Sequence, residues 1–234
     1  HSNAALTLLA LFPLFCMITG ERMSTLLSIP AVLLLGWGTV RQAPALRVNV
    51  LVMFVVLALL ATALLALEGD VFDRIVSATA GSLANFATDN YGSVFRTGVH
   101  VWLLHPWTGV GLSSYAEYCD VFARGRDLYL CGRHPHNIYL HWLAEAGVPA
   151  LLLFVASIAA LVYRPLRIAR TKGRWLLLSM QSAILFVHFW PLAAAPAIIN
   201  NWFAAIVWCG LGWILASPAL ASRDDSGHDC GNRC

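Results

Sequence analysis

The chain has 234 residues, of which 59% are hydrophobic and only 12% are charged, and its formal net charge at pH 7 is +3. This composition excludes an ordinary soluble domain, in which about a quarter of the residues are charged. The mean hydropathy of +0.70 predicts an integral membrane protein instead. The small positive charge gives no reason to expect a nucleic acid as a partner, because the basic residues gather in short loops between apolar runs.

Six apolar runs come close to the length of a membrane span, which is about 20 residues for about 30 Å of hydrocarbon. They occupy residues 2–19, 23–40, 48–67, 137–162, 175–190 and 196–217. Such runs are typical of a helical bundle, since a helix satisfies its own backbone hydrogen bonds within lipid. The sequence therefore predicts an all-α, polytopic membrane protein with about six transmembrane helices.

Basic residues predict how these spans are oriented, because short loops rich in Lys and Arg stay in the cytoplasm. The loop after the second span holds Arg41 and Arg47 and no acid. The loop after the fourth span also lacks acids and holds Arg164, Arg167, Arg170, Lys172 and Arg174. With both loops inside, the segment 68–136 faces the periplasm of a bacterial inner membrane.

This topology divides the chain into four parts. We expect three transmembrane helices in 1–67, a periplasmic loop with amphipathic helices in 68–136, three more transmembrane helices in 137–217, and a disordered cytoplasmic tail in 218–234. The periplasmic loop is nearly a third of the chain, and unstructured loops of such length are uncommon unless they bind or catalyse something. The functional site is therefore expected in this loop and next to it.

One part of the loop, residues 91–104 (YGSVFRTGVHVWLL), predicts an amphipathic helix on the membrane face, because apolar side chains are mixed with Arg96. Pro106 is expected to end this helix, and Gly109 and Gly111 predict turns. These glycines do not form a dinucleotide-binding or phosphate-loop motif.

Two cysteines, Cys119 and Cys131, also lie in the exterior segment. An oxidising periplasm would allow them to form a disulfide. Two cysteines close in sequence are weak evidence for pairing, so a disulfide and two free thiols both stay open at this point.

A polar cluster stands where the fourth apolar run begins, in HPHNIYLHWLAEAG at 134–147. Pro135 disfavours a helical conformation at His134, and Asn137 can cap the helix that follows. His136 is therefore expected on the non-helical shoulder at the membrane surface.

Asn137, His141 and Glu145 recur at every fourth residue, so they share one face of that helix. Polar groups in lipid cost several kcal/mol each unless they have partners, so this face must meet protein or water. Arg22, in the short turn between the first two spans, is expected on the same side of the bilayer as Arg96 and His136. Taken alone, Arg22 is typical of an interfacial anchor.

Three ordered stretches resemble successive signature motifs of the O-antigen ligase and O-antigen polymerase superfamily. They are TGER at 19–22, FRTGVHVWLLHPWTGVGLSSY at 95–115 and HPHNIYLHWLAEAGVPALLLF at 134–154, and the resemblance covers about residues 1–165. Members are bacterial inner-membrane glycosyltransferases that use glycans carried on undecaprenyl diphosphate. Ligases transfer the glycan to the lipid A core, polymerases join repeat units, and related enzymes glycosylate proteins. The chain is shorter than typical members by several N-terminal spans, so we expect an N-terminally shortened member.

The resemblance implies that Arg22 and Arg96 stand where the family binds the diphosphate, and that His136 stands at its essential histidine. Guanidinium groups stabilise the charge that grows on a leaving diphosphate, and a neutral imidazole can take the proton of an acceptor hydroxyl. Supporting roles are expected for Asn137, His141 and Glu145. The implied partners are an undecaprenyl-diphosphate-linked glycan donor, the lipid A core or another glycan acceptor, and the lipid bilayer. Neither a metal nor a cofactor is required.

Alternatives remain beside the ligase-like interpretation. The acceptor could be that of an O-antigen-type polymerase or of a protein O-oligosaccharyltransferase, because short motifs do not encode the acceptor pocket. A transporter or flippase of lipid-linked sugars is the alternative from another class, although the spans carry no Lys, Arg or Asp away from their ends. A zinc site built from His134, His136, His141 and Glu145 matches no standard ligand spacing.

Overall fold

The computed structural model describes residues 2–124, 129–191 and 204–217. All regular elements in this part of the chain are helices, so the predicted all-α class is confirmed there. The α-helices are α1 (Ser2–Thr19), α2 (Arg22–Gln42), α3 (Arg47–Leu67), α4 (Gly69–Phe72), α5 (Ala78–Ala84), α6 (Asn90–Leu104), α7 (Tyr115–Ala123), α8 (Ile138–Lys172), α9 (Trp175–Phe189) and an unlabelled helix, Ala204–Ser217. A 3-10 helix at Pro44–Leu46 and a π-helix at Asp73–Ser77 join neighbouring α-helices. The expected tail at 218–234 and the first part of the expected span at 196–217 lie outside the described residues.

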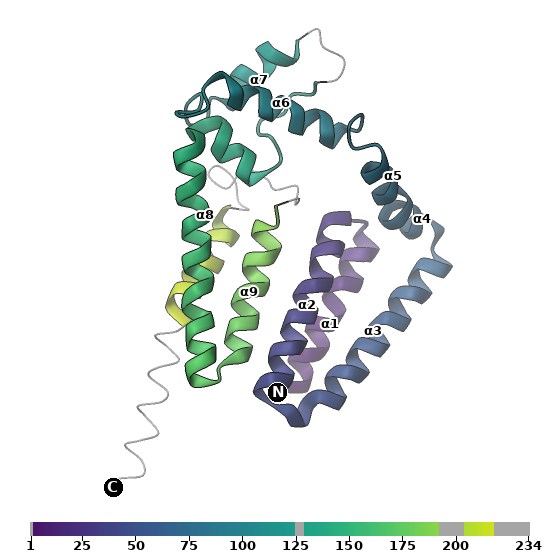
Figure 1. Cartoon of the computed structure of the whole chain (residues 1–234). Coiled ribbons are helices and arrows are strands. Elements are labelled where there is room, and N and C mark those ends of the chain that lie inside the picture. Colours follow the sequence, from purple (N-terminus) through teal and green to yellow (C-terminus); the bar gives the residue numbers. More distant parts are fainter. Residues whose placement is uncertain (1, 125–128, 192–203, 218–234) are drawn as a thin grey trace.

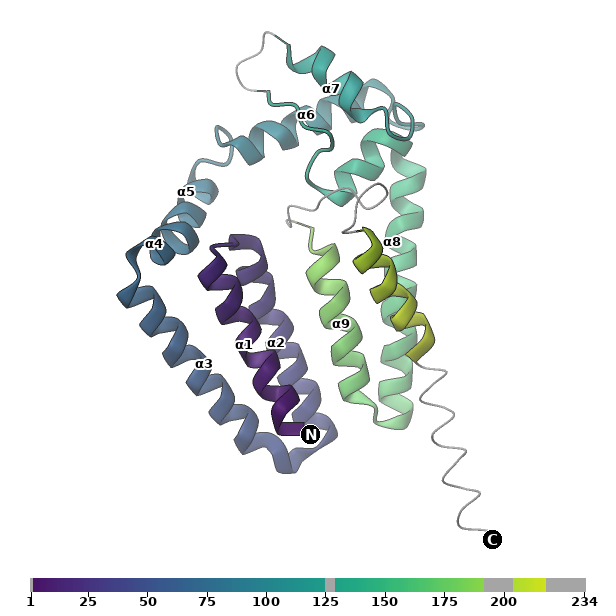
Figure 2. The ribbon, with the colours of Figure 1, turned by 180° about the vertical axis from the view of Figure 1, so that it is seen from behind.

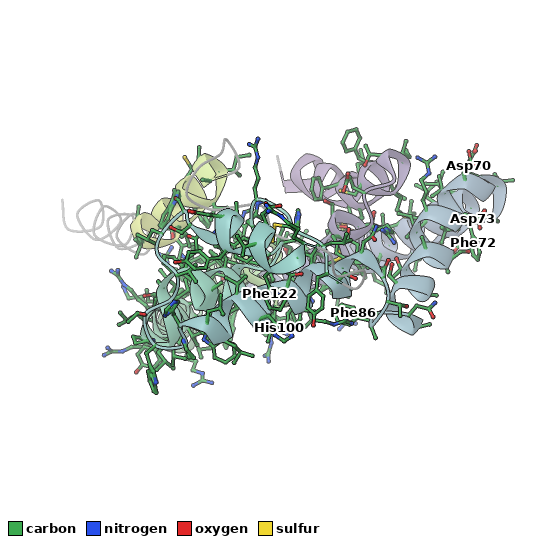
Figure 3. The ribbon with its side chains drawn as sticks, turned by 90° about the horizontal axis from the view of Figure 1, so that it is seen from above. Asp70, Phe72, Asp73, Phe86, His100 and Phe122 are labelled. Carbon is green, nitrogen blue, oxygen red and sulfur yellow. A yellow bond between two sulfur atoms is a disulfide. The ribbon has the colours of Figure 1, made fainter. Side chains whose placement is uncertain are left out.

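The long helices lie alongside one another, and α4 to α7 run across one end of this bundle (Figures 1 and 2). Consecutive long helices alternate in direction, so the starts of α2 and α8 are at the end that α4 to α7 cover. The short turns that join α2 to α3 and α8 to α9, with their basic residues, are at the opposite end. Seen from above, the covering helices extend as a band from Asp70 and Asp73 past Phe86 to His100 and Phe122 (Figure 3).

Among the described residues, three helical segments are long and apolar enough to cross a membrane: Arg22–Gln42, Pro44–Leu67 and Ile138–Lys172. Two shorter apolar helices, Trp175–Phe189 and Ala204–Ser217, lie beside them. In α3 only Val50 is buried, as is typical of a helix whose sides face lipid. The number of about six spans, the four-part division of the chain and the orientation in the membrane stay predictions.

Helix α8 is longer than the predicted span at 137–162, because it continues through the basic segment to Lys172. Arg170 and Lys172 occupy its last turn, where cations stabilise the negative end of the helix dipole. The helix ends at Gly173, whose φ of +69° is a common C-terminal cap. The basic loop expected from the sequence is thus mostly a helical extension.

A kink near the start of α8 joins it to the connection between α6 and α7. Gly147 has φ +74° and ψ −174°, which interrupts the helix. The connection supplies backbone partners at this point: Val110 N donates to Ala144 O at 2.8 Å and Gly111 N to Glu145 O at 3.0 Å. The expected turns at Gly109 and Gly111 are confirmed by their φ values of +67° and +107°.

A small core and a covalent link hold α7 in place. Val101, Tyr115, Cys119 and Ala144 form a buried cluster between α6, α7 and α8. Cys119 is also bonded to Cys131, so of the two alternatives for these cysteines the structure contains the disulfide. Since Cys131 lies just before the polar cluster, the disulfide ties that segment to α7.

Candidate active site

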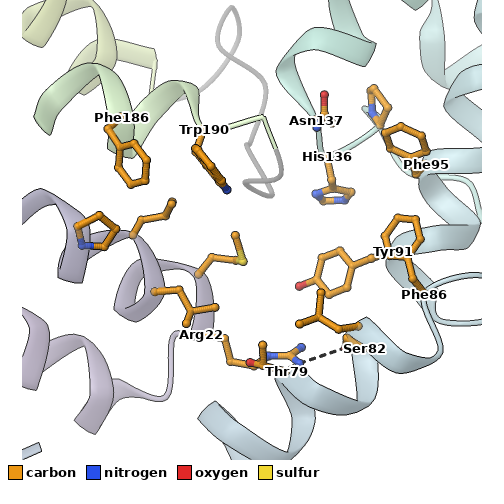
Figure 4. A pocket seen from close by; sticks show the side chains of 16 residues that line it. Arg22, Thr79, Ser82, Phe86, Tyr91, Phe95, His136, Asn137, Phe186 and Trp190 are labelled. Atoms are coloured by element: carbon orange, nitrogen blue, oxygen red, sulfur yellow. Dashed lines mark hydrogen bonds between the residues drawn. The ribbon is translucent and has the colours of Figure 1, made fainter. Parts of the chain in front are cut away.

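A cavity of about 600 Å³ opens beneath the covering helices, where α2 begins and α9 ends (Figure 4). Most of its lining is apolar or aromatic: Met23, Leu26, Leu27, Pro30, Leu83, Phe86, Phe95, Pro135, Phe186 and Trp190. The polar lining residues are Arg22, Thr79, Ser82, Tyr91, His136 and Asn137. The cavity can therefore hold a largely apolar molecule that also carries a polar group.

Arg22 is the first residue of α2, which follows a turn at Gly20 with φ +74°. From there its side chain extends toward α5 and α6. Its Nη1 lies 3.4 Å from Ser82 Oγ, and its guanidinium carbon lies 6.0 Å from the centroid of the Tyr91 ring. These contacts hold a permanent positive charge at the wall of the cavity.

His136 reaches the same cavity from the shoulder before α8, as expected. Its backbone has φ +52°, a conformation that few residues with a side chain adopt. The following Asn137 fixes this geometry, because its Oδ1 accepts hydrogen bonds from Tyr139 N at 3.1 Å and Leu140 N at 3.0 Å. Its Nδ2 also donates to Pro191 O at 2.6 Å. The expected helix cap at Asn137 is therefore confirmed.

The protonation state of His136 is the one that a general base requires. Burial lowers the pKa of His136 below its usual value, because an imidazolium loses solvation when water is removed. The ring is therefore neutral near pH 7 and has a nitrogen lone pair available. An uncharged imidazole in the same cavity as a guanidinium can accept a proton while the guanidinium binds an anion.

Arg96 lies on α6 next to the cavity but is not among the residues that line it. Its Nη2 donates to Ala87 O, and its guanidinium carbon is 5.7 Å from the centroid of the Tyr129 ring. Its neighbour Phe95 does line the cavity. The structure thus brings Arg22 and His136 to one cavity and leaves Arg96 outside its lining.

His141 and Glu145 lie deeper in α8 and do not line the cavity. Glu145 is 5% exposed, and its Oε2 lies 3.2 Å from His141 Nε2. Its Oε1 accepts a hydrogen bond from Tyr115 N, the first amide of α7, at 3.4 Å. The pair therefore holds the start of α7 against α8.

His134 lies near both His136, which lines the cavity, and His141, which pairs with Glu145. Its ring centroid lies 4.4 Å from that of His136 and 6.3 Å from that of His141. Burial, and then the neighbouring histidines, lower the pKa of His134 to about 4. Within the described residues, no group of three or more His, Cys, Asp or Glu side chains is arranged to hold a metal ion.

Several cavity residues were missed from the sequence, above all Tyr91 and Ser82. For Tyr91 a signal existed, because Tyr91 and Phe95 are four residues apart on a predicted helix and so share a face. Ser82 carries no such signal. It lies in a short helix whose position over α2 depends on contacts between distant parts of the chain.

Comparison with known protein families gives a match over residues 5–155, more than half of the chain, to the family model described as O-antigen ligase. The matched region contains Arg22, Arg96 and His136. It confirms the resemblance seen in the three sequence stretches. No curated protein and no solved structure matches significantly.

Proposed function

Because this chain belongs to the O-antigen ligase family, we propose that it transfers a glycan from an undecaprenyl-diphosphate carrier to an acceptor hydroxyl at the periplasmic face of the bacterial inner membrane. The family itself makes the chain a membrane protein of the glycosyltransferase superfamily that contains O-antigen ligases and polymerases. The donor, the acceptor and the orientation are the proposed part.

The observation that carries the proposal is the meeting of Arg22 and His136 in one mainly apolar cavity. A lipid-linked diphosphate has both parts that this lining requires, namely a hydrocarbon chain and an anionic group. Arginine binds diphosphate oxygens with paired, charge-assisted hydrogen bonds. The imidazole on the opposite wall is free of positive charge near pH 7, so it can serve the acceptor.

In the proposed reaction the acceptor oxygen forms a bond to the anomeric carbon of the donor glycan. His136 takes the hydroxyl proton, while the bond between the anomeric carbon and the diphosphate oxygen breaks and the diphosphate leaves with the electron pair. Arg22 stabilises the charge that grows on the leaving group. Such a direct displacement inverts the anomeric configuration and uses neither a metal nor a cofactor.

Arg96 is proposed as a second ligand of the diphosphate. Its guanidinium lies over the Tyr129 ring, and Arg96 is not among the residues that line the cavity. To reach the diphosphate it has to release the Ala87 carbonyl. Asn137 acts on His136 through the cap of α8, and His141 and Glu145 act through α7.

The test is glycan transfer by purified protein in proteoliposomes with an undecaprenyl-diphosphate-linked glycan. His136→Ala is expected to lose transfer by about 10²- to 10⁴-fold, the usual contribution of a general base. His105→Ala is the matched control, since His105 is exposed at the end of α6 and does not line the cavity. Full transfer by His136→Ala contradicts the proposal. Movement of the donor across the bilayer without glycan joining would favour a transporter.

The acceptor is tested in the same vesicles. A ligase joins the glycan to the lipid A core, a polymerase joins it to a second lipid-linked repeat unit, and a protein O-oligosaccharyltransferase joins it to a polypeptide. We propose the ligase reaction. Product with one of the other two acceptors alone would assign the alternative activity to the same site.

A further inference from the structure

Tyr91 lies in the middle of the cavity, but the reaction proposed above gives this residue no role. It belongs to the first turn of α6 and lines the cavity together with Arg22 and His136. In Figure 4 its ring lies between the guanidinium of Arg22 and the imidazole of His136, and its hydroxyl points into the open middle of the cavity. The residue is 43% exposed, unlike a tyrosine that serves the core, whose ring is buried.

The ring of Tyr91 helps to hold Arg22 in position. At 6.0 Å from the ring centroid, the guanidinium is within the range at which a cation and an aromatic face attract each other. Ser82 Oγ, 3.4 Å from Arg22 Nη1, supports the guanidinium from α5. Contacts from two other helices thus orient the guanidinium before a ligand arrives, which lowers the entropy lost on binding.

The hydroxyl of Tyr91 is available to a ligand. In the part of the chain that the structure describes, this hydroxyl has no hydrogen-bond partner. Tyr129 lies against Arg96 as Tyr91 lies against Arg22. The Tyr129 hydroxyl differs in that it lies 3.2 Å from His100 Nε2. Arg22 and Arg96 are therefore each paired with a tyrosine ring, and of the two tyrosine hydroxyls the one that faces the cavity is that of Tyr91.

The charge of the lining indicates what this hydroxyl binds. Of the described residues that line the cavity, Arg22 alone carries a permanent charge, so the cavity selects an anion. A phenol O–H beside a guanidinium adds a donor to the same anion. The neighbouring Leu26, Leu27 and Pro30 favour an anion attached to a hydrocarbon chain.

We propose that Tyr91 is a further substrate-binding residue, whose hydroxyl donates a hydrogen bond to the diphosphate that Arg22 binds. The identity of the diphosphate as that of the lipid-linked donor rests on the function proposed above. The role of the hydroxyl rests on the cavity geometry.

The experiment measures binding of undecaprenyl diphosphate to the full chain in detergent, with inorganic diphosphate as a second probe, so that no transfer step is required. Tyr91→Phe removes only the hydroxyl and is expected to weaken binding of the lipid about tenfold, the lower part of the range for a hydrogen bond to a charged group. Tyr91→Leu also removes the ring and is expected to weaken binding further. Tyr118→Phe is the matched control, because it removes the same hydroxyl group from a tyrosine of α7 that does not line the cavity.

Binding by Tyr118→Phe within about threefold of the native chain, together with the tenfold loss in Tyr91→Phe at an unchanged unfolding temperature, supports the proposal. Equal binding by Tyr91→Phe and the native chain overturns it, even if glycan transfer is observed. An equal loss in Tyr118→Phe overturns it as well, since the loss of binding would then not be specific to the hydroxyl in the cavity. If inorganic diphosphate binds as tightly as the lipid, the ligand is free diphosphate rather than a carrier lipid, and the lipid part of the proposal is wrong. Failure of the native chain to bind either probe overturns both this proposal and the proposed function.

Discussion

The backbone of Gly147 lies directly against that of Trp107: a Cβ atom added at Gly147 would sit 2.3 Å from the Trp107 carbonyl oxygen. This contact joins the kink of α8 to the connection between α6 and α7. The contact therefore joins three parts of the fold into one supporting unit. These parts are the segment before α8 that carries His136, helix α7 with its disulfide, and helix α6, which lines the cavity. The residues that line the cavity depend on this support for their positions.

Gly147→Ala is expected to destabilise the protein by more than about 2 kcal/mol. The backbone at Gly147, with φ +74° and ψ −174°, is accessible essentially to glycine alone, at a cost of about 1–3 kcal/mol for other residues, and the clash with Trp107 adds to this. Thermal unfolding in detergent measures the effect. Gly81→Ala is the control, because its Cβ would meet nothing within 4 Å in α5, and it is expected to be neutral or slightly stabilising. An equal unfolding temperature for Gly147→Ala and the native chain would contradict the rigid contact.

Removing the disulfide is expected to loosen the segment that carries His136. The Cys119–Cys131 bond closes a loop with a sequence separation of 12, and closing such a loop stabilises a fold by about 2–4 kcal/mol. Gly132, next in the chain, lies close to His136, since a Cβ there would be 3.5 Å from His136 Nε2. The double variant Cys119→Ala, Cys131→Ala should therefore unfold at a lower temperature and transfer glycan more slowly.

The matched control for the disulfide is Cys209→Ala, because Cys209 is a free, exposed thiol. It should leave both the unfolding temperature and its response to a reducing agent unchanged. If the native protein unfolds at the same temperature with and without reductant, the disulfide does not stabilise this part of the fold.

Stability is expected to fall as the pH decreases from about 6.5 to 4. Burial lowers the pKa of His134 to about 4 in the folded chain, whereas its ordinary value is 6.5. Between these values the unfolded chain binds a proton that the folded chain does not, so protonation favours unfolding. His134→Asn removes this difference. The unfolding temperature of the variant should depend less on pH over this interval, and equal dependence in both proteins would show that His134 is not buried in this way.

The features that could be predicted from the sequence are those set by neighbouring residues. Asn137 caps the helix that begins at the next residue, Gly109 and Gly111 make their own turns, and the helix at 91–104 follows from its pattern. The kink at Gly147 and the contact of Arg22 with Ser82 were not predicted, because each depends on a segment far away in the chain. A single sequence contains no direct record of such contacts.

The same limit explains the candidate site. Family motifs gave Arg22, Arg96 and His136, and the structure brings two of them to one cavity. They gave no indication that Phe95 would line the cavity and Arg96 would not, since that depends on how α6 is rotated about its axis. The rotation is set by buried side chains on the opposite face, such as Val101 against Tyr115.

The rate of transfer is expected to stay high to a lower pH than an ordinary histidine would allow. Burial lowers the pKa of His136, so its neutral, proton-accepting form persists below pH 6.5. The acidic limb of kcat/KM, which reports the free enzyme, should therefore have its midpoint below 6.5. A midpoint at or above 6.5 would mean that another group, or a differently exposed His136, limits the reaction.

The two arginines are expected to respond differently to replacement by lysine. Arg22 lines the cavity and uses its planar guanidinium to contact Ser82 and the Tyr91 ring, whereas lysine supplies a point charge without this geometry. Arg22→Lys should therefore reduce kcat/KM for the lipid-linked donor by roughly 10- to 100-fold, part of the effect of removing a transition-state donor entirely. Arg96→Lys should have a smaller effect, because Arg96 has to move before it reaches the diphosphate.

Arg124→Lys serves as the control for both changes. Arg124 is exposed just after the end of α7 and pairs with Asp120 at 2.9 Å, a surface contact of little energetic weight. Steady-state transfer at several donor concentrations separates kcat from KM for the three variants. Unchanged kcat/KM in Arg96→Lys, beside a loss in Arg22→Lys, would restrict the diphosphate site to the arginine in the cavity. Unchanged kcat/KM in Arg22→Lys would remove the anion-binding role on which the proposed transfer depends, because no other described residue of the lining carries a fixed positive charge.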